Sequence, residues 1–311
     1  MVVPRKIFVL WLQGEAAAPP LVKMCLLRWR RLNPGYELKV LDLSDAKRIL
    51  SGFPMDVSKM RPQALSDVLR IRLLRDQGGV WADATTFPIL PLDYWLPDAT
   101  STGFFAFQGH RRPLDVDSWL IAAEMNHIIP RLWWQEIERY WSRPRKLITF
   151  SSFEANYNFD PLSFFRSDRQ LSTETYPYYW VMYIFSHLLL SDSDFRSAWA
   201  RVPKRSSTEC HAIQLASSDE PEVSDRELVQ ASLRTPVQKL SHRSSETWRW
   251  LRLDAAFHEH DLEFPINATQ YEPYQNDCGE MTLYDRAKWS VRQQVGVLGS
   301  RIPWYLRPPW Q

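Results

Sequence analysis

The sequence predicts an α/β fold with a mostly parallel central sheet, and three observations lead to this prediction. The 311 residues are 45% hydrophobic and 24% charged, which is the composition of a folded globular chain. Residues 6–43 read as strand, helix and strand, and a β-α-β unit of this kind builds a parallel sheet. A further helix followed directly by a strand lies within residues 62–86. The length suits one large domain.

The opening unit begins with an apolar run of strand length at residues 6–12. Apolar residues then recur at near-helical spacing over residues 21–32, and the turn signal Asn33-Pro34-Gly35 ends this helix. Residues 36–40 alternate between apolar and polar side chains, as a half-buried strand does, and the alternation slips at Leu41, so the strand is expected to end or bulge near Asp42. Together these three segments predict the first parallel strand pair.

The next helix is predicted from Pro62 to Asp76 because its apolar residues form one broad face. Gly78-Gly79 ends it and leads into a short strand at residues 80–86 that closes in polar residues. The helix and the strand are thus joined by a tight connection.

The middle of the chain continues the α/β pattern. Residues 104–107 predict a strand, whereas residues 119–125 and 130–140 predict helices. The apolar run that opens residues 176–200 predicts a buried core helix, since about 15 apolar residues are too few to span a membrane.

Charge and cysteine usage exclude several classes of protein. The 38 basic residues nearly balance the 36 acidic ones, so the chain lacks the concentrated positive charge of a nucleic-acid-binding protein. Its three cysteines contain no CxxC pair, which argues against a disulfide framework and a cysteine-rich zinc site and favours a cytoplasmic protein. Four motifs are absent from the sequence: GxGxxG of dinucleotide-binding proteins, GxxxxGK[ST] of P-loop proteins, HExxH of zincins and GxSxG of hydrolases.

Three charged residues around the Gly78-Gly79 turn form the densest candidate site. Asp67 and Arg70 are three residues apart and project from one face of the predicted helix. Asp83 closes the following strand, and ligands of open α/β sheets bind at the carboxyl ends of strands. A carboxylate there can accept sugar hydroxyls or hold a divalent ion. The alternative is an ordinary surface ion pair beside a strand-end aspartate.

The order of residues 66–85 is S-D-x-L-R-x-x-x-L-x-x-x-G-G-V-W-x-D-A-T. This order resembles the sugar-binding region of DxD-type glycosyltransferases, most closely the capsular polysaccharide synthesis protein family. Residues 4–14 resemble the opening strand of that family and residues 25–43 its next segment, and the resemblance covers about residues 4–245. It implies a GT-A fold with a Rossmann-like sheet over residues 1–284.

The resemblance also implies an activity. The chain is expected to transfer a sugar from a nucleotide-sugar donor to a hydroxyl of a polysaccharide or lipid-linked acceptor, with retention of configuration. Trp11 corresponds to an aromatic residue that stacks on the nucleobase, and its alternative is a plain core tryptophan. Asp67 and Arg70 correspond to the pair that holds the donor sugar and its phosphate side, and Asp83 to the first aspartate of DxD. The remaining implied donor-site residues are Gln13, Gly14, Gly79 and Thr85.

The second carboxylate of DxD is replaced by Thr85. The resemblance implies a Mn²⁺ or Mg²⁺ ion at Asp83, but a neutral hydroxyl is a poor ligand for such an ion, so a weak or absent metal site is expected. Lys239 and His242 are then candidates to offset the charge of the leaving diphosphate, as catalytic cations or, for His242, as one metal ligand. Their alternative is a pair of solvated surface residues.

Residues 285–311 form a basic tail with five Lys or Arg residues and three Trp residues. Aromatic and basic side chains favour an anionic lipid surface, so this tail predicts peripheral attachment to the inner face of the plasma membrane. The alternative is a tail packed against residues 1–284.

Two other functions fit the same sequence. One is an effector-like glycosyltransferase that modifies a protein hydroxyl. The other is a non-catalytic nucleotide-sugar-binding module, which the missing second aspartate favours.

Overall fold

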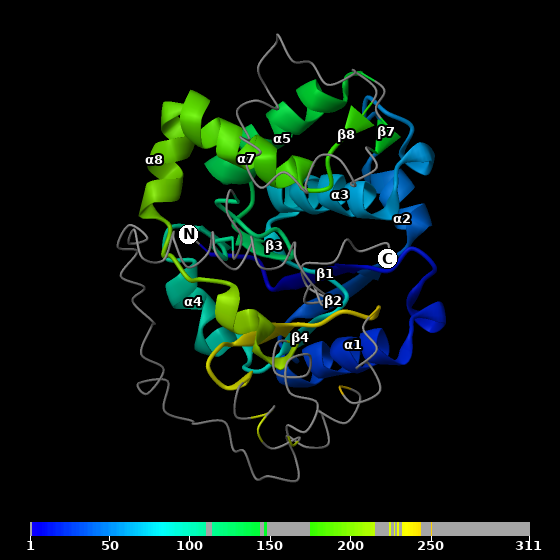
Figure 1. Ribbon diagram of the computed structural model, residues 1–311, viewed down its shortest axis with the longest axis vertical. Coiled ribbons are helices and arrows are strands. Elements are labelled where there is room, and N and C mark those ends of the chain that lie inside the picture. Colours follow the sequence, from blue (N-terminus) through cyan, green and yellow to red (C-terminus); the bar gives the residue numbers. More distant parts are fainter. Residues whose placement is uncertain are drawn as a thin grey trace, which may run out of the picture.

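The computed structural model describes residues 2–109, 114–143, 146–147, 175–214 and 232–243, with residues 224, 227, 229 and 250. The predicted tail at 285–311 lies outside these residues. The described chain forms a five-stranded central sheet between two layers of helices (Figure 1). The sheet order is β2 (Glu37–Leu41), β1 (Lys6–Leu10), β3 (Gly79–Ala82), β6 (Leu120–Ala123) and β5 (Phe104–Ala106).

The sheet is mostly parallel. Strand β1 pairs in parallel with both β2 and β3, whereas β6 is antiparallel to both of its neighbours, β3 and β5. Four strands therefore share one direction and β6 opposes them. The predicted α/β class with a mostly parallel central sheet is confirmed.

Within the described part of the chain, one face of the sheet is covered by a first layer of helices, α2 (Leu43–Ile49), α3 (Pro62–Gln77), α5 (Ile128–Trp141), α7 (Trp180–Ser191) and α8 (Ser193–Arg201) (Figure 1). The other face is covered by a second layer, α1 (Pro20–Leu32) and α4 (Leu96–Ala99). Among the described residues, the helices are all too short or too polar to cross a bilayer.

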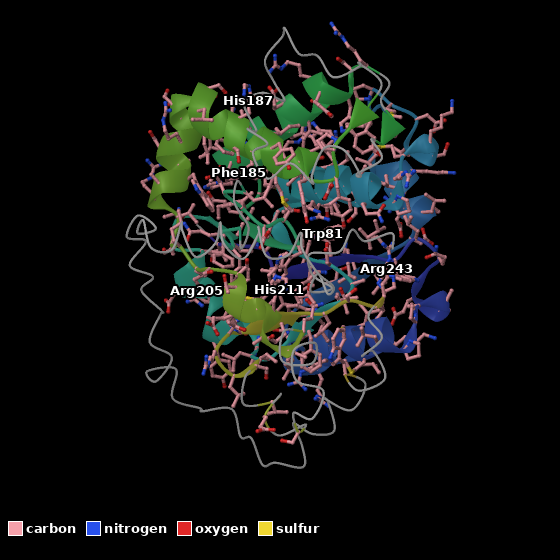
Figure 2. The ribbon with its side chains drawn as sticks, viewed as in Figure 1. Trp81, Phe185, His187, Arg205, His211 and Arg243 are labelled. Carbon is pink, nitrogen blue, oxygen red and sulfur yellow. The ribbon has the colours of Figure 1, made fainter. Side chains whose placement is uncertain are left out.

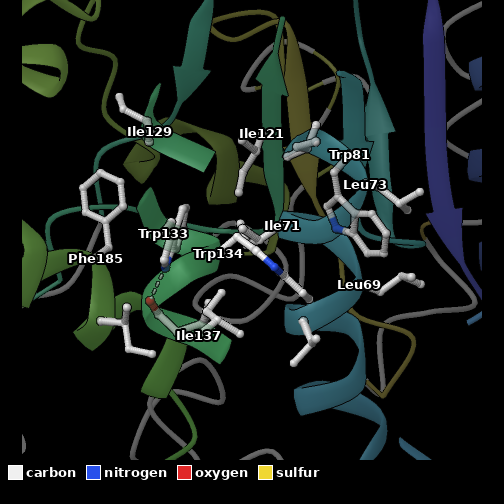
Figure 3. Packing of buried hydrophobic residues seen from close by; sticks show 14 of the residues in the cluster. Leu69, Ile71, Leu73, Trp81, Ile121, Ile129, Trp133, Trp134, Ile137 and Phe185 are labelled. Carbon is white, nitrogen blue, oxygen red and sulfur yellow. Dashed lines mark hydrogen bonds between the residues drawn. The ribbon is translucent and has the colours of Figure 1, made fainter. Parts of the chain in front are cut away.

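Alternate residues of each strand supply the two cores. Phe8, Trp81 and Ile121 face the first layer, whereas Ile7 and Val80 face the second. Figure 3 shows the first core, in which the Trp133 indole donates a hydrogen bond of 3.0 Å to the carbonyl of Val181. Burying each such large apolar side chain contributes about 1.5–3 kcal/mol, so these aromatic layers fix the sheet against its helices.

Short elements complete the described chain. The 3₁₀ turns are η1 (Glu15–Ala17), η2 (Val57–Lys59), η3 (Leu92–Tyr94) and η6 (Thr208–His211). Strands β7 (Lys146–Leu147) and β8 (Thr175–Tyr176) form a parallel pair, and β4 (Thr86–Pro88) pairs antiparallel with β9 (Val237–Lys239). The β4–β9 pair aligns Thr86 with Lys239 and so brings the distant residue 239 beside the end of β3.

One predicted helix is wrong. Residues 119–125 contain the strand β6, which is buried on both faces between β3 and β5. Because a short apolar run that is buried on all sides shows no periodicity, its sequence does not distinguish a strand from a helix. Here the pairing of the segment with β3 and β5 makes it a strand. The apolar run that opens residues 176–200 contains the predicted buried helix, but this helix, α7, begins only at Trp180, and Tyr176 lies in β8. Asp192 follows α7 and caps the separate helix α8 by accepting a hydrogen bond from the amide of Phe195.

Candidate functional site

The helix α3 presents Asp67 and Arg70 toward the sheet. Its first turn carries Pro62, and it ends at Gly78, whose φ of 62° is open to glycine. The Arg70 Nη2 atom lies 3.1 Å from Asp67 Oδ1, and the two side chains are only 6% and 10% exposed. The alternative of a surface ion pair is therefore wrong, because this pair is buried.

Asp83 follows the carboxyl end of β3 and joins the same network. Its Oδ1 atom lies 3.2 Å from Arg70 Nη2 and accepts a hydrogen bond of 3.0 Å from the Trp81 indole, labelled near the centre of Figure 2. The amide of Asp83 donates to the carbonyl of Trp119 at 2.8 Å. Arg70 thus bridges two carboxylates, while the Asp83 side chain keeps 27% of its surface exposed to a ligand.

The remaining donors of Arg70 also meet protein acceptors. Nη1 donates to the carbonyl and hydroxyl oxygens of Ser118 at 2.5 and 2.6 Å. Nη2 and Nε donate to the hydroxyl and carbonyl oxygens of Ser66 at 3.0 and 3.3 Å. The Arg70 guanidinium also lies over the Trp81 ring, 5.3 Å from its centroid. Because its donors are engaged in this way, Arg70 is placed to position Asp83.

Lys239 approaches Asp83 from the other side. Its Nζ atom lies 3.3 Å from Asp83 Oδ2 and donates a hydrogen bond of 2.9 Å to Thr85 Oγ1. The amide of Leu240 donates to the carbonyl of Thr85 at 3.0 Å, which ties the end of β9 to the same turn. The cluster therefore holds two carboxylates, Asp67 and Asp83, and two cations, Arg70 and Lys239.

The two carboxylates differ in acidity. Burial raises the pKa of Asp67 to about 7, Arg70 opposes this rise, and the nearby Asp83 charge adds to it. Burial also acts to raise the pKa of Asp83, but Arg70 and Lys239 outweigh it, so that pKa lies below its ordinary value. Asp83 is consequently ionised at neutral pH, whereas Asp67 exchanges a proton near neutrality.

Trp11 and His242 meet beside this cluster. Their ring centroids are 5.3 Å apart and their planes are nearly perpendicular. Trp11 follows β1 and is half-buried, and its indole nitrogen is buried without a hydrogen-bond partner among the described residues. Partial desolvation, Arg243 and Lys239 lower the pKa of the exposed His242, which favours its neutral form at neutral pH.

The three other predicted donor-site residues have different surroundings. Gln13 is exposed, and Gly14 has a φ of 79° with no atom within 4 Å of the place that a Cβ would occupy. Gly79 is buried with a φ of 101°, and a Cβ there would lie 2.8 Å from the carbonyl oxygen of Lys6. Gly79 therefore permits the close approach of β1 and β3, and Gly14 shapes the turn after Trp11.

Sequence reasoning missed several neighbours of the site. Ser66 and Ser118 hold Arg70, and Ser66 is the first residue of the motif at residues 66–85. Tyr178 precedes α7 and lies near both carboxylates, since burial, Tyr179, Asp67 and Asp83 all raise its pKa. Because Tyr178 lies in a run of aromatic residues, the sequence did not single it out as a neighbour of the two carboxylates.

The cluster does not fit a divalent ion. Over the part of the chain that the structure describes, three side chains of the His, Cys, Asp or Glu type do not gather anywhere in a metal-binding group. Both Asp83 oxygens face cationic groups, and Thr85 already accepts from Lys239. A divalent ion at Asp83 Oδ2 would be repelled by the Lys239 ammonium, which lies 3.3 Å from that oxygen.

Comparison with known proteins agrees with the resemblance seen in the sequence. A family model described as "Capsular polysaccharide synthesis protein" matches residues 2–160, which include Trp11, Asp67, Arg70 and Asp83 but not Lys239. The curated proteins contain no match. A solved structure titled "PaToxG Glycosyltransferase" is 13% identical, covers 81% of this chain and 84% of its own, and has a TM-score of 0.34. With the family model spanning half of the chain, the protein belongs to the capsular polysaccharide synthesis protein family.

Proposed function

We propose that this protein is a glycosyltransferase that moves a sugar from a nucleotide-sugar donor to a hydroxyl of a polysaccharide or lipid-linked acceptor. Membership of the capsular polysaccharide synthesis family supports a glycosyltransferase role. The observation that carries the proposal is the Asp67–Arg70–Asp83 network at the carboxyl end of β3, inside the family-matched segment. Parallel sheets bind ligands at this end of their strands.

The roles of the residues follow from their surroundings. The exposed part of the Asp83 carboxylate accepts hydrogen bonds from hydroxyls of the donor, while Arg70 and Trp81 hold its Oδ1 atom in place. Lys239 offers its ammonium to the diphosphate. Trp11, next to His242, provides an aromatic surface for the base. Asp83, Lys239 and Trp11 would then bind three different parts of one donor.

The transfer breaks the bond between the anomeric carbon and the diphosphate oxygen, and the bonding electrons leave with that oxygen. A bond forms between the anomeric carbon and the acceptor oxygen, whose proton passes to the departing diphosphate. In the retaining form that we propose, the acceptor attacks from the face that the diphosphate leaves. Positive charge beside the diphosphate stabilises this step because negative charge grows there.

The test uses UDP-, GDP- and CDP-sugars with the purified protein and an Asp83→Asn variant. Transfer or donor hydrolysis is expected for the wild type, with at least a ~100-fold loss in the variant, as when one preorganised electrostatic group is removed. Asp93→Asn is the matched control, because Asp93 forms an exposed pair with Arg5 at 3.0 Å. Equal turnover in Asp83→Asn and Asp93→Asn would contradict the assigned site.

The same assay separates the two other functions. Transfer to a protein hydroxyl, with no transfer to glycan or lipid-linked acceptors, identifies the effector-like enzyme. Tight binding of a nucleotide-sugar without turnover identifies a binding module.

We also propose that residues 285–311 attach the enzyme to an anionic membrane surface. The proposal rests on the five basic residues and three Trp residues of this segment. Binding to liposomes is expected to require anionic lipid, to weaken with salt and to vanish on truncation after Tyr284, while turnover with a water-soluble acceptor persists. Liposome binding by the truncated protein would overturn the proposal.

A further inference from the structure

We propose that the Lys239 ammonium takes the place of the divalent cation in this site, so that a nucleoside diphosphate binds without metal. This inference rests on the proposed function and specifies how the site neutralises the diphosphate. Lys239 Nζ lies 3.3 Å from Asp83 Oδ2 and 2.9 Å from Thr85 Oγ1. One cation thereby contacts both the first and the last residue of the Asp83-Ala84-Thr85 sequence.

The replacement of a carboxylate by Thr85 is consistent with this role. A second carboxylate beside Asp83 would need a second positive charge, which a divalent ion carries and an ammonium does not. The Thr85 hydroxyl instead accepts a hydrogen bond from Lys239 without adding charge. The ionised Asp83 carboxylate already faces two cations, Arg70 and Lys239, before any ion is added.

The ammonium is also held in place by the fold. Lys239 lies on β9 opposite Thr86, and its side chain is 19% exposed. The preceding residue, Gln238, is fully buried, and its amide nitrogen donates to the Glu209 carbonyl and to Thr235 Oγ1, both at 2.9 Å. Gln238 therefore anchors the strand from the opposite side.

An ammonium has three N–H donors. Two of them are directed at Asp83 and Thr85, and Lys239 shows no other polar contact among the described residues. The third donor is available for an oxygen of the diphosphate. Arg70, by contrast, is surrounded by protein acceptors, so Lys239 is the cation of this cluster that can reach the ligand.

The experiment measures binding of UDP, GDP and CDP by calorimetry, with excess EDTA or with excess Mn²⁺. For the wild type, the dissociation constant of the nucleotide that binds is expected to be the same under both conditions. Lys239→Met is expected to weaken binding by about 10- to 100-fold in EDTA, the range for losing one charge-assisted hydrogen bond. Lys39→Met is the control, because Lys39 also lies on a strand and pairs with one carboxylate at 3.3 Å, away from the site. Lys239→Arg keeps a cation and is expected to keep metal-independent binding, which covers a failure of Lys239→Met to fold.

A second arm needs no nucleotide. The double variant Thr85→Asp with Lys239→Met restores two carboxylates and removes the ammonium, so it is expected to bind Mn²⁺ in a paramagnetic resonance titration, whereas the wild type does not. Nucleotide binding by the wild type only with Mn²⁺, or equal Mn²⁺ binding by wild type and double variant, would overturn the inference. If none of the three nucleotides binds the wild type, the proposed function fails, and the Mn²⁺ titration alone decides the role of Lys239.

Discussion

Replacing Arg70 with lysine tests whether this guanidinium positions the site. Arg70 makes six polar contacts, four hydrogen bonds to Ser66 and Ser118 and two ion pairs to Asp67 and Asp83. An ammonium has three donors, so at least three of these contacts are lost. Breaking a buried ion pair by removing one partner costs about 3–5 kcal/mol, and we expect the free energy of unfolding to fall by that amount.

For a chain of this size, such a loss lowers the melting temperature by roughly 6–20 °C, at about 2–4 °C per kcal/mol. Thermal unfolding followed by circular dichroism measures it, and turnover is compared at a temperature where both proteins are folded. Turnover is expected to fall as well, because Asp83 loses the group that orients its Oδ1 atom.

Arg48→Lys is the matched control for this change. Arg48 also pairs with an aspartate three residues earlier, Asp45, at 2.8 Å, but its side chain is 72% exposed. A change within about 0.5 kcal/mol is expected there. If Arg70→Lys melts with the wild type and keeps full turnover, the fork geometry of Arg70 has no role and the reasoning is refuted.

Three further predictions concern single residues. Asp67 keeps its proton up to about pH 7 in the folded protein but releases it near 3.8 when unfolded, so its contribution to the free energy of unfolding falls as pH rises through that window. Denaturant titrations at several pH values should therefore show Asp67→Asn gaining stability relative to wild type as pH rises. Gly79→Ala should lower the free energy of unfolding by about 2–4 kcal/mol, because the residue has a positive φ and the added Cβ would clash with a carbonyl oxygen. Gly52→Ala should lower it by only about 1–2 kcal/mol, because no atom lies within 4 Å of the place of its Cβ. Trp11→Ala should weaken nucleotide binding by about 10-fold, near the value of one base stack, and Trp11→Phe by less; equal binding by all three proteins would remove Trp11 from the donor site.

Local pattern was sufficient to predict most of the described fold. The helix α3 begins at Pro62 as predicted, because proline at a helix start and glycine after its end are signals within the sequence itself. The strand β6 was missed because its identity depends on two neighbouring strands that no local pattern reveals. Where tertiary pairing rather than periodicity decides an element, a single sequence is a weak guide.

The candidate site was likewise predictable only in part from the sequence. The family resemblance and helical spacing brought Asp67, Arg70 and Asp83 together, and their contacts are found in the structure. The burial of the pair could not be read from the sequence, because polar and apolar residues are mixed around α3 and do not mark one exposed face. Lys239 was proposed as a cation, but its contacts with Asp83 and Thr85 depend on a strand pairing that spans about half of the chain.

The pairing of β4 with β9 links the stability of the fold to the charge of the site. Strand β9 is short, and the buried Gln238 and the bond from Leu240 to Thr85 fix the position of Lys239 on it. An ammonium on a long, flexible stem loses side-chain entropy when it is ordered by a ligand. Here Asp83 and Thr85 order it beforehand, so this cost is met on folding rather than on binding. The same preorganisation means that substitutions behind β9, at Gln238, should weaken diphosphate binding although Gln238 is buried away from the ligand.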